Sequence, residues 1–179
     1  MKIYDADCQK QAIRYITENY LKAPTRRGCF FIVGQYGSGK SWVMRQLASQ
    51  YGVELINLNL YLAQSLEGEP DFDKLIRFNS KKINTLFRGY LKRLFETKLT
   101  SADGFDLLLI DNIELLHEYD VDLINTFNSL CINASAQQSV KCIVSIPATV
   151  SDGYLYPFDN PKLRTKWNEF MFELKVIEL

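Results

Sequence analysis

Residues 34–41 read Gly-Gln-Tyr-Gly-Ser-Gly-Lys-Ser, a complete G-x-x-x-x-G-K-[ST] phosphate-binding pattern. In such a loop, backbone N–H groups surround the phosphates, the lysine neutralises charge and the serine hydroxyl holds magnesium. The apolar run 29–33 before it is typical of a buried parallel strand. After it, apolar residues recur at helical spacing: Trp42, Val43, Leu47 and Tyr51. This order of strand, loop and helix predicts a phosphate site at a helix N-terminus.

Composition indicates one globular domain of ordinary size. The chain has 179 residues, 47% of them hydrophobic, and a formal net charge of zero. Nucleic-acid contact would therefore require a local basic patch. No signal-peptide pattern is present, and no apolar run approaches the roughly 20 residues that span a bilayer. Four dispersed cysteines without a C-x-x-C pair favour a reducing, cytoplasmic setting, and the single histidine, His117, cannot build a metal site alone.

Hydrophobic periodicity predicts alternating helices and strands. We expect helices over 5–22, 72–95 and 121–132. Strands are expected over 29–33, 54–58 (with an alternating and apolar continuation to 63), 105–110, 142–146 and 170–179. The prediction is a single P-loop NTPase domain over 1–179, with an N-terminal helix and loop in 1–28 and a nucleotide-binding core in 29–179. Its fold class is a three-layer α/β/α arrangement around a mainly parallel five-stranded sheet.

A second motif completes the expected magnesium site. Four hydrophobic residues, 107–110, lead into Asp111, which is a Walker B pattern at the C-terminal end of a strand. Asp111 is expected to hold the ion opposite Ser41. The alternative is that Asp111 only caps the following segment. The separation of the two motifs leaves room for an extra strand, and the strand 142–146 should then lie beside both Walker strands.

Hydrolysis is less strongly indicated than binding. Asn112 follows the Walker aspartate, and an amide can orient a water molecule but cannot take its proton. The nearest carboxylate is Glu114, whose alternative interpretation is a solvated residue that opens the next loop. Ser145 and Thr149 are candidate sensors of the γ-phosphate or of the attacking water. Arg164 is a candidate arginine finger at a subunit boundary, or else a solvated cation.

The expected site residues fall into three groups. The catalytic candidates are Lys40, Asp111, Asn112, Glu114 and Arg164. The metal candidates are Ser41 and Asp111. The nucleotide contacts are expected to be Gly34, Gln35, Tyr36, Gly37, Ser38, Gly39, Lys40, Ser41, Trp42 and Ser145. The expected cofactors are ATP and Mg²⁺; the chain lacks the N/T-K-x-D motif of guanine-specific proteins.

These motifs resemble those of AAA+ and other additional-strand P-loop ATPases. A closer resemblance, over about 25–179, is to the BrxF family of lidless P-loop proteins from type 3 BREX phage-defence systems. The segments that carry it are 33–41, 59–63, 111–114, 152–155 and 161–164. The resemblance implies an ATP-binding subunit of an assembly that recognises or excludes phage DNA. AAA+ proteins normally carry a helical lid after the last strand, so the end of this sequence at Leu179 makes motor-like remodelling doubtful.

Two surfaces are candidates for partners. Within the expected helix over 72–95, polar residues follow one face: Arg77, Lys81, Asn84, Arg88 and Lys92. This face could contact a DNA backbone or an acidic protein, or could be only the solvated side of the helix. A second group of residues, the aromatics Tyr154, Tyr156, Phe158 and Trp167, suits either a protein interface or core packing.

The principal hypothesis is a magnesium-dependent ATPase of the lidless AAA+-like kind that acts in phage defence, as a homo-oligomer or with other defence proteins. The first alternative is a nucleotide-switched module that does not hydrolyse ATP. The second is a DNA-replication loader or initiator. A small-molecule kinase is more distant, because the sequence shows no arginine-rich lid between strands.

Overall fold

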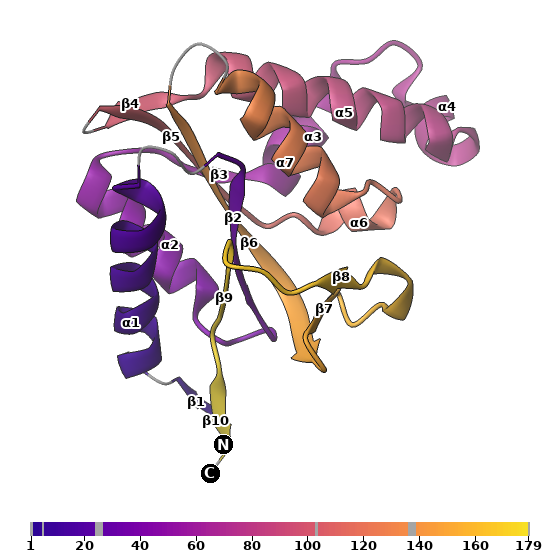
Figure 1. Cartoon of the computed structure of the whole chain (residues 1–179). Helices are drawn as coiled ribbons and strands as arrows, with labels where there is room; N and C mark the ends of the chain where they lie inside the picture. Colours follow the sequence, from indigo (N-terminus) through magenta and orange to yellow (C-terminus); the bar gives the residue numbers. More distant parts are fainter. Residues whose placement is uncertain (1, 5, 24–26, 103, 136–138, 179) are drawn as a thin grey trace.

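Five parallel strands form the centre of the computed structural model, in the order β3-β5-β6-β2-β9 (Figure 1). They are β3 (Leu55–Asn57), β5 (Phe105–Asp111), β6 (Val140–Ser151), β2 (Cys29–Gly34) and β9 (Met171–Glu173). The structure describes residues 2–4, 6–23, 27–102, 104–135 and 139–178. The strand β6 pairs in parallel with both β2 and β5. The predicted extra strand between the two Walker strands is thus confirmed.

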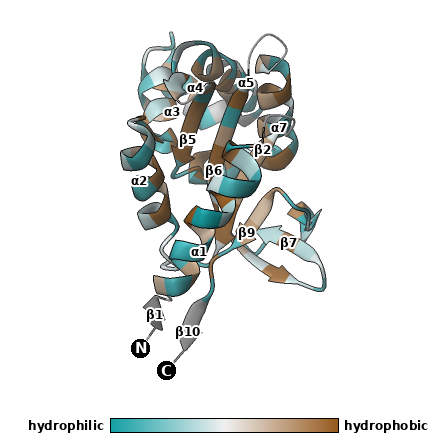
Figure 2. Cartoon of the chain, turned by 60° about the vertical axis from the view of Figure 1, so that its left-hand side comes forward, coloured by the Kyte–Doolittle hydropathy of each residue, from teal (hydrophilic) through white to brown (hydrophobic). Residues whose placement is uncertain are grey.

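Alternate residues of the central strands enter two separate hydrophobic clusters. Phe30 and Ile32 of β2 face one cluster, whereas Phe31 and Val33 face the other. Since successive side chains of a strand point to opposite faces, a continuous apolar run is needed to bury both faces of a sheet. Figure 2 shows these apolar strands between helices whose outer sides are hydrophilic. The three-layer α/β/α fold class is confirmed.

The helices divide between the two faces of the sheet. One face is covered by α1 (Ala6–Ile16), which continues as the π-helix η1 (Thr17–Leu21), and by α2 (Lys40–Tyr51) (Figure 1). The other face carries α3 (Leu58–Glu67), α5 (Ser80–Thr97), α6 (Glu114–Glu118) and α7 (Leu123–Ala134), with α4 (Phe72–Phe78) beyond them. Within the described ranges, no helix is both long and apolar enough to cross a membrane.

Antiparallel strands that the sequence did not indicate extend the sheet. The strand β4 (Thr100–Ala102) pairs with β5, and the long end of β6 pairs with β7 (Tyr154–Pro157), which pairs with β8 (Thr165–Lys166). The short helix η2 (Pro161–Leu163) links β7 and β8. Phe158 stacks on His117 at 4.3 Å between ring centroids, and Trp167 packs against the larger cluster. These two aromatic side chains therefore pack against the body of the protein.

The strand predicted over 54–58, with its continuation to 63, is wrong beyond Asn57. Helix α3 begins at Leu58, because the Asn57 side chain accepts a hydrogen bond from the N–H of Leu60 at 3.1 Å and caps it. Leu58, Leu62 and Leu66 are then buried one helical turn apart. Over the four residues 57–60, alternation fits a strand and a helix almost equally well, so the sequence pattern misled.

The single helix predicted over 72–95 is two helices, α4 and α5. Asn79 separates them with φ −146° and ψ 62°, and its side chain caps α5 by accepting from the N–H of Lys82 at 3.1 Å. The polar face that was expected to run from Arg77 to Lys92 is therefore interrupted. In addition, the side chain of Asn84 donates to the carbonyl of Tyr119 at 2.8 Å and is part-buried.

The last strand, predicted over 170–179, is also divided. The strand β9 pairs in parallel with β2, whereas β10 (Val176–Glu178) pairs antiparallel with β1 (Lys2–Tyr4). Residue 179 lies outside the described residues. The two strands β1 and β10 form a ribbon that brings both ends of the chain together below the sheet (Figure 1).

Candidate nucleotide-binding site

The phosphate loop connects the end of β2 to the first turn of α2, as predicted. Two of its glycines have no room for a side chain. A Cβ atom on Gly34 would lie 2.6 Å from both the carbonyl oxygen of Leu174 and the hydroxyl of Ser38. A Cβ atom on Gly39, whose φ is +89°, would overlap the side-chain amide of Gln9. The loop is thus packed from one side by β9 and its continuation and from the other by α1.

Lys40 lies under the loop and is largely buried. Its ammonium group donates to the carbonyls of Gly34 and Gln35, both at 2.8 Å. Burial lowers the pKa of Lys40 to about 8, although the carboxylates of Asp111 and Glu114 oppose that shift. A desolvated cation is well placed to balance the negative charge of a phosphate, and the nearby carboxylates can balance a divalent metal ion.

Asp111 ends β5 at the edge of the sheet where the phosphate loop begins. The hydroxyl of Ser145 on β6 donates to its Oδ1, and the N–H of Asn112 donates to the same atom at 3.0 Å. Both Asp111 and Ser145 are buried. Ser145 therefore orients the carboxylate of Asp111 from the neighbouring strand. From the sequence, Ser145 was expected only as a sensor of the γ-phosphate or of the attacking water.

Glu114 is held by a residue that sequence reasoning left without a role. The side chain of Asn59 donates from Nδ2 to Oε2 of Glu114 at 2.7 Å and accepts at Oδ1 from the N–H of Leu115 at 3.0 Å. The backbone N–H of Asn59 also donates to the carbonyl of Asn112 at 2.9 Å. Asn112 adopts a left-handed φ of +56°. These three bonds fix the segment after Asp111. The sequence feature that could have pointed to Asn59 is its position just beyond β3, the strand that lies beside β5.

A cavity of about 670 Å³ joins these groups, a volume within the usual range for a ligand pocket. The predicted residues that line it are Tyr36, Gly37, Gly39, Lys40, Ser41, Trp42, Asp111, Asn112, Glu114 and Ser145. Gly34, Gln35 and Ser38 belong to the loop but do not line the cavity. The lining residues that sequence reasoning missed are Ala6, Gln9, Arg45 and Pro147.

Arg164 does not line this cavity. It borders a smaller one of about 170 Å³ with Asp122 and Thr165, and its guanidinium lies 5.2 Å from the ring centroid of Tyr154. Thr149 is half-buried on β6, where it pairs with Tyr156 of β7, and is also absent from the lining. Within one chain, therefore, neither of these two candidates is placed beside Lys40 and Asp111.

The donor atoms at the site fit magnesium. Ser41 offers a hydroxyl and Asp111 a carboxylate, both hard oxygen ligands, from two elements that line the same cavity. The described residues contain no group of three or more His, Cys, Asp or Glu side chains arranged to hold a metal. This is the ligand set expected of an ion that takes its other ligands from phosphate and water.

The profile of the AAA domain family matches residues 23–149, which include the loop, Asp111 and Ser145. The chain belongs to the AAA domain family. Membership makes it a P-loop ATPase-type protein with a nucleotide-binding loop. The part of the chain that this AAA domain profile leaves unmatched includes α1, with Gln9, and the hairpin that carries Arg164.

AMPPCP-bound DnaA from Aquifex aeolicus matches at 16% sequence identity with a TM-score of 0.42. The alignment covers 97% of this AAA domain chain and 48% of that one, so the chain spans about half the length of DnaA. No curated protein matches the chain.

Proposed function

We propose that this chain is a magnesium-dependent ATPase that acts as a subunit of a bacterial anti-phage assembly of the BREX type. The observation that carries the ATPase part is the convergence of Lys40, Ser41 and Asp111 on one cavity. Lys40 and the loop amides bind the phosphates, while Ser41 and Asp111 would hold magnesium. When bound, the ion would neutralise charge that develops on the phosphate oxygens.

Glu114 is the carboxylate that serves the attacking water. It takes the proton as the new oxygen–phosphorus bond forms and the bond to the bridging oxygen of ADP breaks. Asn112, whose amide cannot accept that proton, orients the water. The bond from Asn59 engages one oxygen of Glu114. We therefore expect slow hydrolysis by the isolated protein, and this same bond is what favours the second candidate, a nucleotide switch that does not turn over.

Binding and cleavage are tested separately. Titration calorimetry with Mg-ATP should detect binding by the wild type and its loss in Lys40→Ala. Single-turnover cleavage is then compared in the wild type, Glu114→Gln and Glu118→Gln, the last a matched control because Glu118 is exposed on the same short helix α6. Cleavage that is lost only in Glu114→Gln supports the ATPase. Binding without cleavage in any of the three proteins supports the switch, and absence of binding refutes both.

The assignment to phage defence rests on the resemblance to the BrxF family, and AAA domain membership is compatible with it. The same resemblance implies a protein that works within an assembly, with other defence proteins or as a homo-oligomer, and the dispersed cysteines favour a cytoplasmic setting. In an oligomer, Arg164 would reach the site of a neighbouring copy. Mass measurement with and without Mg-ATP, and phage plating on cells in which the gene is deleted from its own operon, test the two parts. Unchanged plating efficiency after deletion would refute the defence role.

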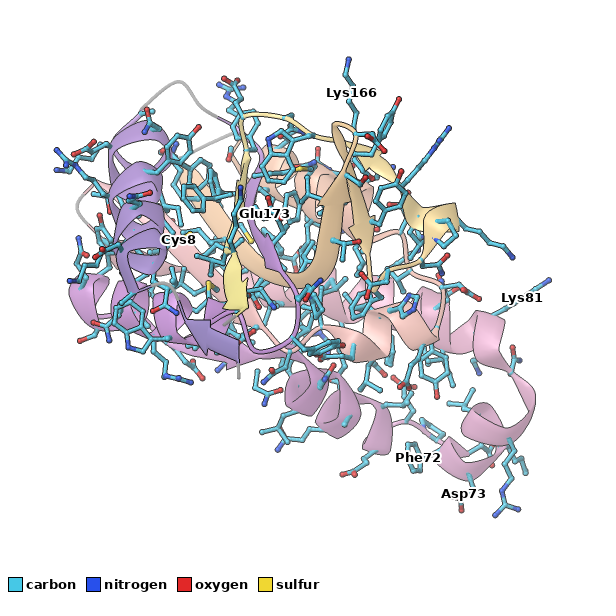
Figure 3. All side chains as sticks on the ribbon, turned by 90° about the horizontal axis from the view of Figure 1, so that it is seen from below. Cys8, Phe72, Asp73, Lys81, Lys166 and Glu173 are labelled. Carbon is cyan, nitrogen blue, oxygen red and sulfur yellow. The ribbon has the colours of Figure 1, made fainter. Side chains whose placement is uncertain are left out.

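The basic face of α5 is proposed as a contact for the DNA backbone. Lys81, Arg88 and Lys92 are exposed, and among the described side chains none of the three forms an ion pair. Lys81 projects from the body of the molecule near the break between α4 and α5, where Arg77 of α4 is also exposed (Figure 3). Each phosphate contact should add a slope of about 0.9 to the fall of log K with log salt.

The test replaces Lys81, Arg88 and Lys92 together by alanine. The matched control replaces three exposed lysines elsewhere: Lys10, Lys162 and Lys166. If DNA follows α5, only the first triple variant weakens binding to a duplex and reduces the salt slope. Equal loss in both variants would mean that only overall charge matters and would refute a contact at α5.

A further inference from the structure

The helix α1 forms one wall of the nucleotide cavity, although it lies outside the residues that match the AAA domain family. Ala6 and Gln9 line the cavity from α1, and Asp111 and Glu114 line the same cavity. Two buried residues of the helix, Ala12 and Ile16, join the hydrophobic cluster beneath it. The helix is therefore packed in place and its cavity-facing side chains have defined positions.

Gln9 is the unusual residue of this wall. It is only 7% exposed, and its side chain lines the cavity. An amide that reaches a cavity can exchange a water molecule for an acceptor atom of a ligand. The amide nitrogen lies directly over Gly39, because that is the atom a Cβ on Gly39 would overlap. This donor is thus held at the phosphate loop itself.

Lys40 of the loop lines the same cavity as Gln9. In a loop of this pattern, backbone N–H groups and the lysine surround phosphates. A further donor placed at such a loop favours an anionic ligand. We propose that Gln9 donates from Nε2 to the phosphate chain of the bound nucleotide, so that α1 is a functional part of the phosphate site. This inference rests on the proposed nucleotide binding and extends it to a residue outside the Walker motifs.

A neighbour of Gln9 in the first turn of α1 also fixes the position of the helix. The thiol of Cys8 donates to the carbonyl of Glu173 on β9 at 3.8 Å, and Figure 3 shows these two residues beside each other. The strand β9 in turn pairs with β2, which leads into the loop. A phosphate bound by Gln9 would therefore strengthen a contact between the N-terminal helix and the strand that carries the loop. Nucleotide binding should protect the amides of α1 from hydrogen exchange.

The experiment compares Gln9→Ala and Gln9→Glu with Gln11→Ala, a matched control because Gln11 is exposed on the same helix. Affinities for Mg-ATP and for Mg-tripolyphosphate are measured by calorimetry, and hydrogen exchange of residues 6–16 is followed with and without Mg-ATP. A hydrogen bond to a charged group predicts that Gln9→Ala weakens both ligands by about tenfold or more. Gln9→Glu should weaken them further, because it places a carboxylate against phosphate. Gln11→Ala should match the wild type.

Three results are decisive. Equal affinities in the wild type and Gln9→Ala would overturn the proposal. A loss for Mg-ATP alone, with unchanged tripolyphosphate binding, would also overturn it, because Gln9 would then contact the base or the ribose. If the wild type binds neither ligand, the proposed function itself fails. This result differs from one in which the wild type binds both ligands and the Gln9 variants bind them equally well. Circular dichroism and thermal unfolding of both Gln9 variants confirm that the compared proteins are folded.

Discussion

Replacing Asn59 by alanine should both destabilise the protein and release Glu114. The substitution deletes two side-chain hydrogen bonds, one to the carboxylate of Glu114 at 2.7 Å and one to the N–H of Leu115 at 3.0 Å. The backbone bond from Asn59 to Asn112 remains. A bond to a charged group contributes about 1.5–3 kcal/mol and a neutral one about 0.5–1.5 kcal/mol. Because Asn59 and Glu114 are only half-buried, water can replace part of each lost hydrogen bond. We therefore expect the free energy of unfolding to fall by about 2 kcal/mol.

Urea unfolding followed by circular dichroism measures this loss, and Asn57→Ala is the matched control. Asn57 caps α3 two residues earlier through one neutral bond, so its replacement should cost about 1 kcal/mol. Single-turnover cleavage of ATP should rise in Asn59→Ala, since both oxygens of Glu114 become available to water, and should be unchanged in Asn57→Ala. An unfolding midpoint for Asn59→Ala equal to that of the wild type would refute a stabilising role for the side-chain hydrogen bonds of Asn59. A fall in cleavage would show that Asn59 positions Glu114 and does not restrain it.

Two further predictions follow from the loop. Gly34→Ala should lower the free energy of unfolding by about 1–3 kcal/mol and weaken Mg-ATP binding, because its Cβ would lie 2.6 Å from the Leu174 carbonyl. The control for the cost of a positive φ is Gly37→Ala, where a Cβ would meet no atom within 4 Å. If the two variants bind and unfold alike, the close packing of β9 against the loop is not what requires glycine. Affinity for Mg-ATP should fall as the pH is raised through about 8, because burial lowers the pKa of the Lys40 ammonium to about 8 and the group then loses its proton. Calorimetry in buffers of different ionisation enthalpy should detect proton uptake on binding above that pH. Absence of this proton uptake would contradict the lowered pKa.

The sequence was sufficient for the parts of the site that are continuous in the chain. The loop, the strand before it and the apolar run that ends at Asp111 each carry their own local pattern, and the order of strands follows from where the extra strand must lie. Gln9 and Asn59 were beyond such reasoning. Gln9 meets Gly39 and Asn59 meets Glu114 only because helices and strands far apart in the chain are packed side by side.

The errors in secondary structure have the same origin. A capping asparagine decides the start of both misassigned helices, Asn57 for α3 and Asn79 for α5. Asparagine is equally at home in loops and at helix N-termini, so it did not mark a boundary by itself. The predicted basic face was consequently too long: Arg77 lies on α4, and only Lys81, Arg88 and Lys92 share α5.

The ribbon of β1 and β10 has a mechanical consequence. Lys2 pairs with Glu178, and Tyr4 with Val176, so force applied to the two outer ends would open this ribbon from one end, one residue pair after another. Strands loaded in this way resist little, because each hydrogen bond bears the load alone. Once the ribbon opens, the next elements under tension are α1 on the N-terminal side and the edge strand β9 on the C-terminal side. Tension between the termini would thus act on the two elements that pack against the phosphate loop before it reaches the inner strands of the sheet.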